Sequence, residues 1–166
     1  MICRLCPRRC GAERTSEQGG GFCRMPAGIV VGRAMLHHWE EPVLSGTRGA
    51  GCIFFSGCNL GCVFCQNGKI SHDNFGKGIS SGRLRAVMEE LIAQGAHCID
   101  LVSPTQFTPW ILEALEKPPG VPVVWNSGGY ECVETLRSLE GKVQIYLPDL
   151  KYALARPARE LSKAED

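Results

Sequence analysis

The sequence lacks any apolar run that approaches the roughly 18 residues a helix needs to cross a membrane. It also lacks a cluster of basic residues, and the net charge is only +1, so nothing in it attracts nucleic acid electrostatically. The first residues, Met1 to Cys6, do not contain the apolar core of a signal peptide. We therefore expect a cytoplasmic protein that binds neither a membrane nor nucleic acid.

Cysteine, in contrast, is abundant: 10 of the 166 residues. Hydrophobic residues make up 44% and charged residues 21%, as in globular proteins, and the length fits one domain with a small appendage. In a secreted protein ten cysteines would indicate disulfides. In a reducing compartment the same number indicates metal binding.

Three of the cysteines, Cys58, Cys62 and Cys65, have the spacing C-x3-C-x2-C directly after the apolar run 53–55. Their thiolates can converge on one inorganic centre if the backbone coils tightly, which the glycines at 57 and 61 allow. Three ligands leave one metal position open for a substrate or cofactor, as in catalytic metal sites. The pattern therefore predicts a cluster-binding loop at the end of a strand.

A second set of cysteines lies in residues 1–27, which hold too few apolar side chains to fold by hydrophobic burial alone. Its four members form a closed ligand set: Cys3, Cys6, Cys10 and Cys23. Tetrahedral zinc is the commoner use of four thiolates, an auxiliary iron–sulfur cluster is a second interpretation, and two disulfides are a third. Residues 28–50 are then expected to form an extended linker or strand.

From residue 51 to residue 166 strands alternate with helices, which predicts an α/β fold with a parallel sheet and covering helices. After the run that precedes the cysteine loop, strands are expected over 98–102, 121–125 and 143–147. The last of these would be an exposed apolar edge.

Helices are predicted between the strands. The first begins after the N-cap Ser80 and stops at Gly95, and the second is capped by Thr108. A third contains residues 133–139, and the tail from residue 153 is helical but broken by Pro157.

Several other residues that can bind metals are expected to play no metal role. His37 and His38 would point to opposite faces of a strand, so the run His-His-Trp-Glu-Glu at 37–41 is interpreted as a polar strand end. The three remaining cysteines lie in or beside apolar runs and are interpreted as small core residues: Cys52, Cys98 and Cys132.

Each predicted strand is followed by a short polar phrase, at 56–58, 103–106, 126–130 and 148–151. Such residues also make ordinary turns. In a parallel barrel or half barrel, however, the carboxyl ends of the strands share one face, where sites are built. The four phrases are therefore expected to surround the cysteine loop.

The phrase F-F-S-G-C-N-L-G-C-V-F-C-Q-N at 54–67 resembles the radical S-adenosylmethionine (SAM) superfamily, in the branch around pyruvate formate-lyase activating enzyme. The cysteine-rich N-terminus resembles a subgroup of that branch whose substrates are often unsettled. The resemblance implies a partial parallel (β/α) barrel, of which about four units are present, so the barrel is expected to be truncated at its C-terminus. It also implies a four-iron four-sulfur cluster on Cys58, Cys62 and Cys65, with SAM chelating the remaining iron.

The resemblance extends to residues that would contact SAM. Asn67 stands where the branch has an asparagine after the third cysteine, and Asn126 stands at the place of a polar residue after the third strand. Asp149 and Lys151 reproduce a D-L-K phrase whose lysine can pair with the SAM carboxylate, so Lys151 joins the three cysteines as an expected catalytic residue. In the superfamily the backbone of a Gly-Gly-Glu phrase binds the amino group of SAM. Here the sequence at 103–106 replaces that phrase, and the carbonyls of Ser103 and Thr105 are expected to bind the amino group instead.

The implied activity is reductive cleavage of SAM to a 5'-deoxyadenosyl radical, which removes a hydrogen atom from a substrate. The branch implies a backbone glycine of a glycyl radical enzyme as that substrate, and flavodoxin or ferredoxin as electron donor. Two alternatives stay open. One is a radical SAM enzyme acting on a small molecule or another protein, and the other is a catalytically silent, metal-stabilised scaffold.

Overall fold

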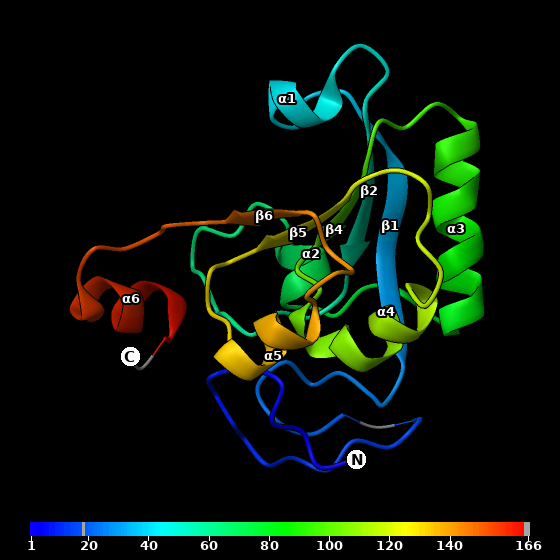
Figure 1. Cartoon of the computed structure of the whole chain (residues 1–166). Helices are drawn as coiled ribbons and strands as arrows, with labels where there is room; N and C mark the ends of the chain where they lie inside the picture. Colours follow the sequence, from blue (N-terminus) through cyan, green and yellow to red (C-terminus); the bar gives the residue numbers. More distant parts are fainter. Residues whose placement is uncertain (18, 165–166) are drawn as a thin grey trace.

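The computed structural model describes residues 1–17 and 19–164, and these contain one six-stranded mixed sheet (Figure 1). Its strand order is β3-β1-β2-β4-β5-β6. β2, β4, β5 and β6 run parallel, whereas β1 is antiparallel to both β2 and β3. The bounds are β1 Ile29–His37, β2 Ala50–Phe55, β3 Lys77–Ile79, β4 Ile99–Val102, β5 Val123–Ser127 and β6 Ile145–Pro148.

The helices are mostly short, and the two that cover the main core, α3 and α4, lie on one side of the sheet (Figure 1). Leu84 and Met88 of α3 and Ile111 of α4 are fully buried against Ile53 and Leu101 of the sheet. The bounds are α1 Pro42–Ser45, α2 Gly68–Ser71, α3 Ser81–Ala93, α4 Thr108–Ala114, α5 Val133–Ser138 and α6 Ala155–Ser162, with a 3-10 turn at Thr105–Phe107.

The opposite face of the sheet carries a smaller cluster of buried residues. Leu44 of α1 packs there against side chains from β2, from β5 and from the residue before β4: Ala50, Cys52, Cys98 and Val124. Within the described chain no helix is long and apolar enough to cross a membrane.

The α/β class and the four parallel strands are confirmed, with β5 and β6 each beginning two residues later than predicted. The strand expected within segment 28–50 is confirmed, because residues 29–37 form β1, and the same segment also contains the short helix α1. The sheet is open, and β6 is one of its edges as expected. On that edge Tyr146 is exposed, whereas Ile145 and Leu147 are half-buried.

Two local predictions are wrong. Thr108 is the first residue of α4 and not its cap, because its hydroxyl donates to the carbonyl of Thr105 (2.8 Å) instead of accepting from the helix. Pro157 does not break the tail helix, because it is the third residue of α6. The first four backbone N–H groups of a helix have no intrahelical partner, so a proline there removes no hydrogen bond.

The cap of α3 provides a test of the local sequence signals. The Ser80 hydroxyl accepts a hydrogen bond from the Arg83 backbone N–H (3.1 Å), and Gly95 takes a φ of +104° just beyond the helix. Ser80→Ala is expected to lower the free energy of unfolding by about 1 kcal/mol. Urea denaturation measures this change. Ser80→Asp keeps an acceptor and should stay close to wild type; equal losses in both variants would contradict the capping role.

Candidate metal centre at the strand ends

The carboxyl ends of the four parallel strands lie next to one another. The Ser103 N–H donates to the carbonyl of Asn126 (2.8 Å), and the Asp149 N–H donates to the carbonyl of Ser127 (2.9 Å). Gln106, which is only 4% exposed, donates from its side-chain amide to the carbonyls of Ser56, Gly57 and Ser103 at 2.9–3.0 Å. The predicted gathering of the polar phrases is thus confirmed. The sequence did not predict that the Gln106 side chain links these strand ends.

The cysteine loop begins at Gly57, where the chain leaves β2. Gly57 has a φ of +69°, and a Cβ there would lie 2.7 Å from the Met25 side chain and 3.0 Å from the Cys23 carbonyl. Only glycine fits this close approach in this conformation. The N-terminal segment therefore packs directly against the start of the loop.

The three thiols of the loop lie close enough to influence one another. Burial raises the pKa of Cys58 to about 11, and the neighbouring Cys62 and Cys65 raise it further against the opposing effects of the Leu60 N–H and Lys151. The Leu60 N–H donates to the Cys58 sulfur (3.4 Å). Among the described residues, no three of the cysteine sulfurs lie within 4.8 Å of one another.

Lys151 lies beside these thiols although it follows a different strand. It forms an ion pair with Asp149, and a Cβ on Gly128 would be 3.8 Å from its Cε. Burial lowers the pKa of Lys151, but the Asp149 carboxylate and the Cys62 and Cys58 thiols outweigh it and raise that pKa. The lysine therefore stays a cation next to groups that become anionic when they bind metal.

The other predicted cofactor-binding residues lie around the same edge and differ in exposure, backbone conformation and hydrogen bonding. Asn67 is exposed at the N-cap of α2. Ser103 has a φ of +54°, a strained conformation for a residue with a side chain. The Thr105 carbonyl already accepts from the N–H and the hydroxyl of Thr108, and Thr105 itself is 2% exposed. The Asn126 amide donates to Asp100 (3.2 Å).

The tail helix α6 contacts the cysteine loop, which sequence reasoning missed. The N–H groups of Gly61 and Val63 donate to the carbonyls of Ser162 (2.9 Å) and Leu161 (2.8 Å). The hydroxyl of Ser162, which is fully buried, donates to the Cys62 sulfur (2.8 Å) and is also bonded to the Tyr152 hydroxyl (2.7 Å). The loop is thus held between the N-terminal segment and the tail.

The four N-terminal thiols also lie near one another. Burial raises the pKa of Cys6 to about 12, with smaller increases from Cys23, Cys3 and Cys10. All ten cysteines are free, so the two-disulfide interpretation has no support. Tetrahedral zinc at a Zn–S distance of about 2.3 Å needs sulfurs roughly 3.8 Å apart. No three of the described sulfurs lie within 4.8 Å of one another, so binding of zinc here would require rotation of the cysteine side chains.

Arg14 joins this segment to the rest of the protein and was not anticipated. It is 1% exposed, and its guanidinium donates to the carbonyls of Met25 (2.8 Å), Pro26 (2.5 Å) and Gln106 (2.7 Å) and lies 3.7 Å from the Cys3 sulfur. Its charge lowers the pKa of Cys23, although burial raises that pKa overall. A buried cation near Cys3 and Cys23 favours the anionic, metal-bound form of these two thiols.

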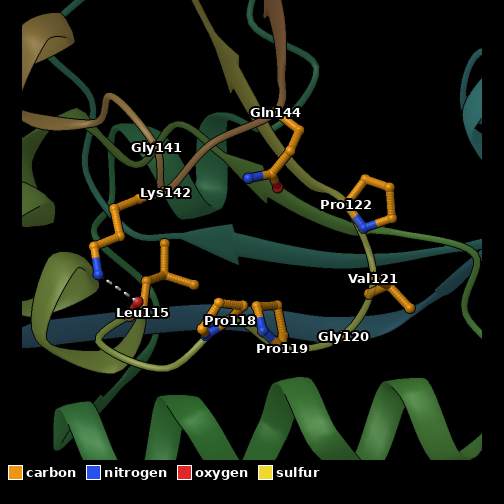
Figure 2. Close-up of a pocket in the computed structure, with 9 residues that line it drawn as sticks. All are labelled: Leu115, Pro118, Pro119, Gly120, Val121, Pro122, Gly141, Lys142 and Gln144. Atoms are coloured by element: carbon orange, nitrogen blue, oxygen red, sulfur yellow. Dashed lines mark hydrogen bonds between the residues drawn. The ribbon is translucent and has the colours of Figure 1, made fainter.

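A cavity of about 270 Å³ lies at the opposite, amino edge of the parallel strands (Figure 2). Its walls come from the loops before β5 and β6 and contain one titratable side chain, Lys142, whose amine donates to the Leu115 carbonyl (3.2 Å). The remaining lining residues are Pro118, Pro119, Gly120, Val121, Pro122, Gly141 and Gln144. The cavity therefore offers little chemistry, and the cysteine loop remains the candidate site.

Comparison with known proteins gives a relative but no function. No protein-family model matches the sequence. An uncharacterized protein of Methanocaldococcus jannaschii is 35% identical over 173 aligned positions, which cover 99% of this chain and 49% of that protein. The chain thus spans about half the length of the curated relative that it matches.

Proposed function

We propose that the chain is a radical SAM protein of the activating-enzyme type. The observation that carries this proposal is the position of Lys151 beside the three-cysteine loop, since the lysine comes from the end of β6 and the loop from the end of β2. One inorganic centre and one anionic group of a cofactor would fit between them. In such a protein β6 is the edge at which a further strand of a partial (β/α) barrel would pair.

The three cysteines of the loop would hold a four-iron four-sulfur cluster. Each cysteine of such a cluster binds a different iron, so the sulfurs stand farther apart than ligands of one metal. The sulfurs of Cys58, Cys62 and Cys65 do not all lie within 4.8 Å of one another, as a cluster with one iron per cysteine allows. When bound with SAM, the cluster would supply the electron for reductive cleavage to a 5'-deoxyadenosyl radical, which removes a hydrogen atom from a substrate.

The chain's own residues would orient SAM. Lys151, which forms an ion pair with Asp149, would also pair with the carboxylate of SAM. The resemblance implies two further side-chain contacts, the amides of Asn67 and Asn126. Of the two expected carbonyls, Ser103 retains a lone pair beside its bond from Gln106, whereas Thr105 has used both. Flavodoxin or ferredoxin would deliver the electron, and the first candidate substrate is a backbone glycine of a glycyl radical enzyme.

The test is formation of 5'-deoxyadenosine by protein reconstituted anaerobically with iron and sulfide, then mixed with SAM and dithionite. Lys151→Met should keep the iron and sulfide content but bind SAM at least about tenfold more weakly, because it loses a charge-assisted contact. Lys163→Met, which removes another lysine next to the loop, should behave as wild type. A wild-type protein that holds a cluster but forms no 5'-deoxyadenosine would contradict the proposal and favour a silent scaffold.

A further inference from the structure

The face of the sheet opposite α3 and α4 contains three metal-binding side chains at one point. Cys52 of β2 and Asp100 of β4 are paired across neighbouring parallel strands and are both 0% exposed. Glu40, from the turn between β1 and α1, reaches the same point and is only half-buried. One ligand atom from each residue lies within 4.8 Å of the other two, the only such group among the described residues.

The two carboxyl groups and the thiol have too few hydrogen-bond donors and no paired cation among the described residues. The Cys52 sulfur lies 3.4 Å from Asp100 Oδ2 and 3.7 Å from Glu40 Oε2, but a thiol has one proton and can donate to only one of them. Asp100 Oδ1 is buried without a hydrogen-bond partner. The Asp100 side chain hydrogen-bonds to Asn126, Cys52 and Glu40, and among the described residues neither Asp100 nor Glu40 forms a salt bridge. A buried carboxylate without a cation is costly.

Both sulfur–oxygen distances in this group match those around a single zinc ion, and all three ligand atoms lie within 4.8 Å of one another. Tetrahedral zinc with a Zn–S bond of about 2.3 Å and Zn–O bonds of about 2.1 Å places sulfur and oxygen about 3.6 Å apart. The two sulfur–oxygen distances here, 3.4 Å and 3.7 Å, bracket that value without any side-chain movement. Mixed thiolate and carboxylate ligands suit zinc, whereas magnesium and calcium take oxygen ligands alone.

Surrounding hydrogen bonds hold two of the ligands in place. The Asn126 amide donates to Asp100 Oδ2 (3.2 Å), and the buried Ser45 hydroxyl donates to the backbone carbonyl of Glu40 (2.5 Å). Such supporting contacts are typical of metal ligands. Of the three ligands, Glu40 is the one that is partly exposed to solvent.

We propose that Glu40, Cys52 and Asp100 form a zinc site with three protein ligands and one open position. The open position would take water or an electron-pair donor of a bound molecule, as in catalytic zinc sites. The three ligands lie outside the cysteine loop and do not depend on the proposed SAM chemistry, although Asn126, which supports Asp100, is also one of the proposed SAM contacts. Cys52 is buried in an apolar cluster as predicted, and the proposal would add a ligand role to it and to Glu40 of the polar run at 37–41.

The test compares zinc bound per folded chain after equilibrium with excess zinc and desalting. Asp100→Asn and Glu40→Gln should each hold one zinc fewer than wild type. Two controls should hold the wild-type number: Glu41→Gln, an exposed neighbouring carboxylate, and Cys98→Ala, a buried thiol of the same cluster directed at the Leu44 carbonyl (3.6 Å). An unchanged zinc number in both Asp100→Asn and Glu40→Gln would overturn the proposal.

A second measurement needs no variant to fold. Cadmium replaces zinc, and the cadmium NMR shift reports how many thiolates bind each ion. Wild-type protein should show one resonance from a site with a single thiolate, distinct from sites with three or four. Spectra with only thiolate-rich sites, at saturating cadmium, would overturn the proposal.

Discussion

Replacing Cys58, Cys62 and Cys65 together with alanine should abolish cluster formation in anaerobically reconstituted protein. Iron and sulfide at this loop should fall from about four of each per chain to none, because no other described thiol lies on the loop to replace the lost ligands. Formation of 5'-deoxyadenosine should fall to background. Metal and sulfide analysis with paramagnetic resonance measures the first change, and chromatography measures the second.

The matched control for that experiment is Cys132→Ala, which removes a buried thiol that is not part of the loop but stands at the N-cap of α5. It should retain the full iron and sulfide content of the loop. The N-terminal thiols are still present in the triple variant, so iron that remains there identifies an auxiliary cluster at Cys3, Cys6, Cys10 and Cys23, and its absence with bound zinc identifies a zinc site. A triple variant with the wild-type paramagnetic signal and product formation would refute the role of the loop.

Replacing Arg14 with methionine should strongly lower the free energy of unfolding. The variant leaves the carbonyls of Met25, Pro26 and Gln106 without their buried donor. Each charged hydrogen bond of this kind contributes about 1.5–3 kcal/mol, so the free energy of unfolding should fall by about 3 kcal/mol or more. Urea denaturation followed by circular dichroism measures the loss.

Two further variants separate hydrogen bonding from charge. Arg14→Lys keeps the cation but cannot reach all three carbonyls, so its loss should be intermediate. Arg9→Met removes an exposed arginine of the same segment, whose one ion pair, with Glu134 at 3.5 Å, is on the surface. It should change stability by no more than about 1 kcal/mol. Similar losses in the Arg9 and Arg14 variants would show that Arg14 does not hold the segment in place.

Features encoded by neighbouring residues could be predicted from the sequence alone. Ser80 and Gly95 mark the ends of α3 because a cap and a left-handed glycine act within one turn of the helix. The four parallel strands and the placement of their polar ends at one edge follow from alternating strands and helices, since parallel strands end on the same side. Errors at Thr108 and Pro157 arose at helix starts, where one residue changes the role of a side chain.

The sequence by itself thus determined the α/β class, the strand ends and the three-cysteine loop, all of which depend on local spacing. Only the tertiary structure decided which distant side chains meet. Arg14 binds the carbonyl of Gln106, 92 positions away, and Ser162 binds the sulfur of Cys62, 100 positions away. The approach of Glu40 to Cys52 and Asp100 likewise depends on strand pairing and on the path of one turn. Sequence spacing carries no information about such contacts, because packing of the whole sheet sets them.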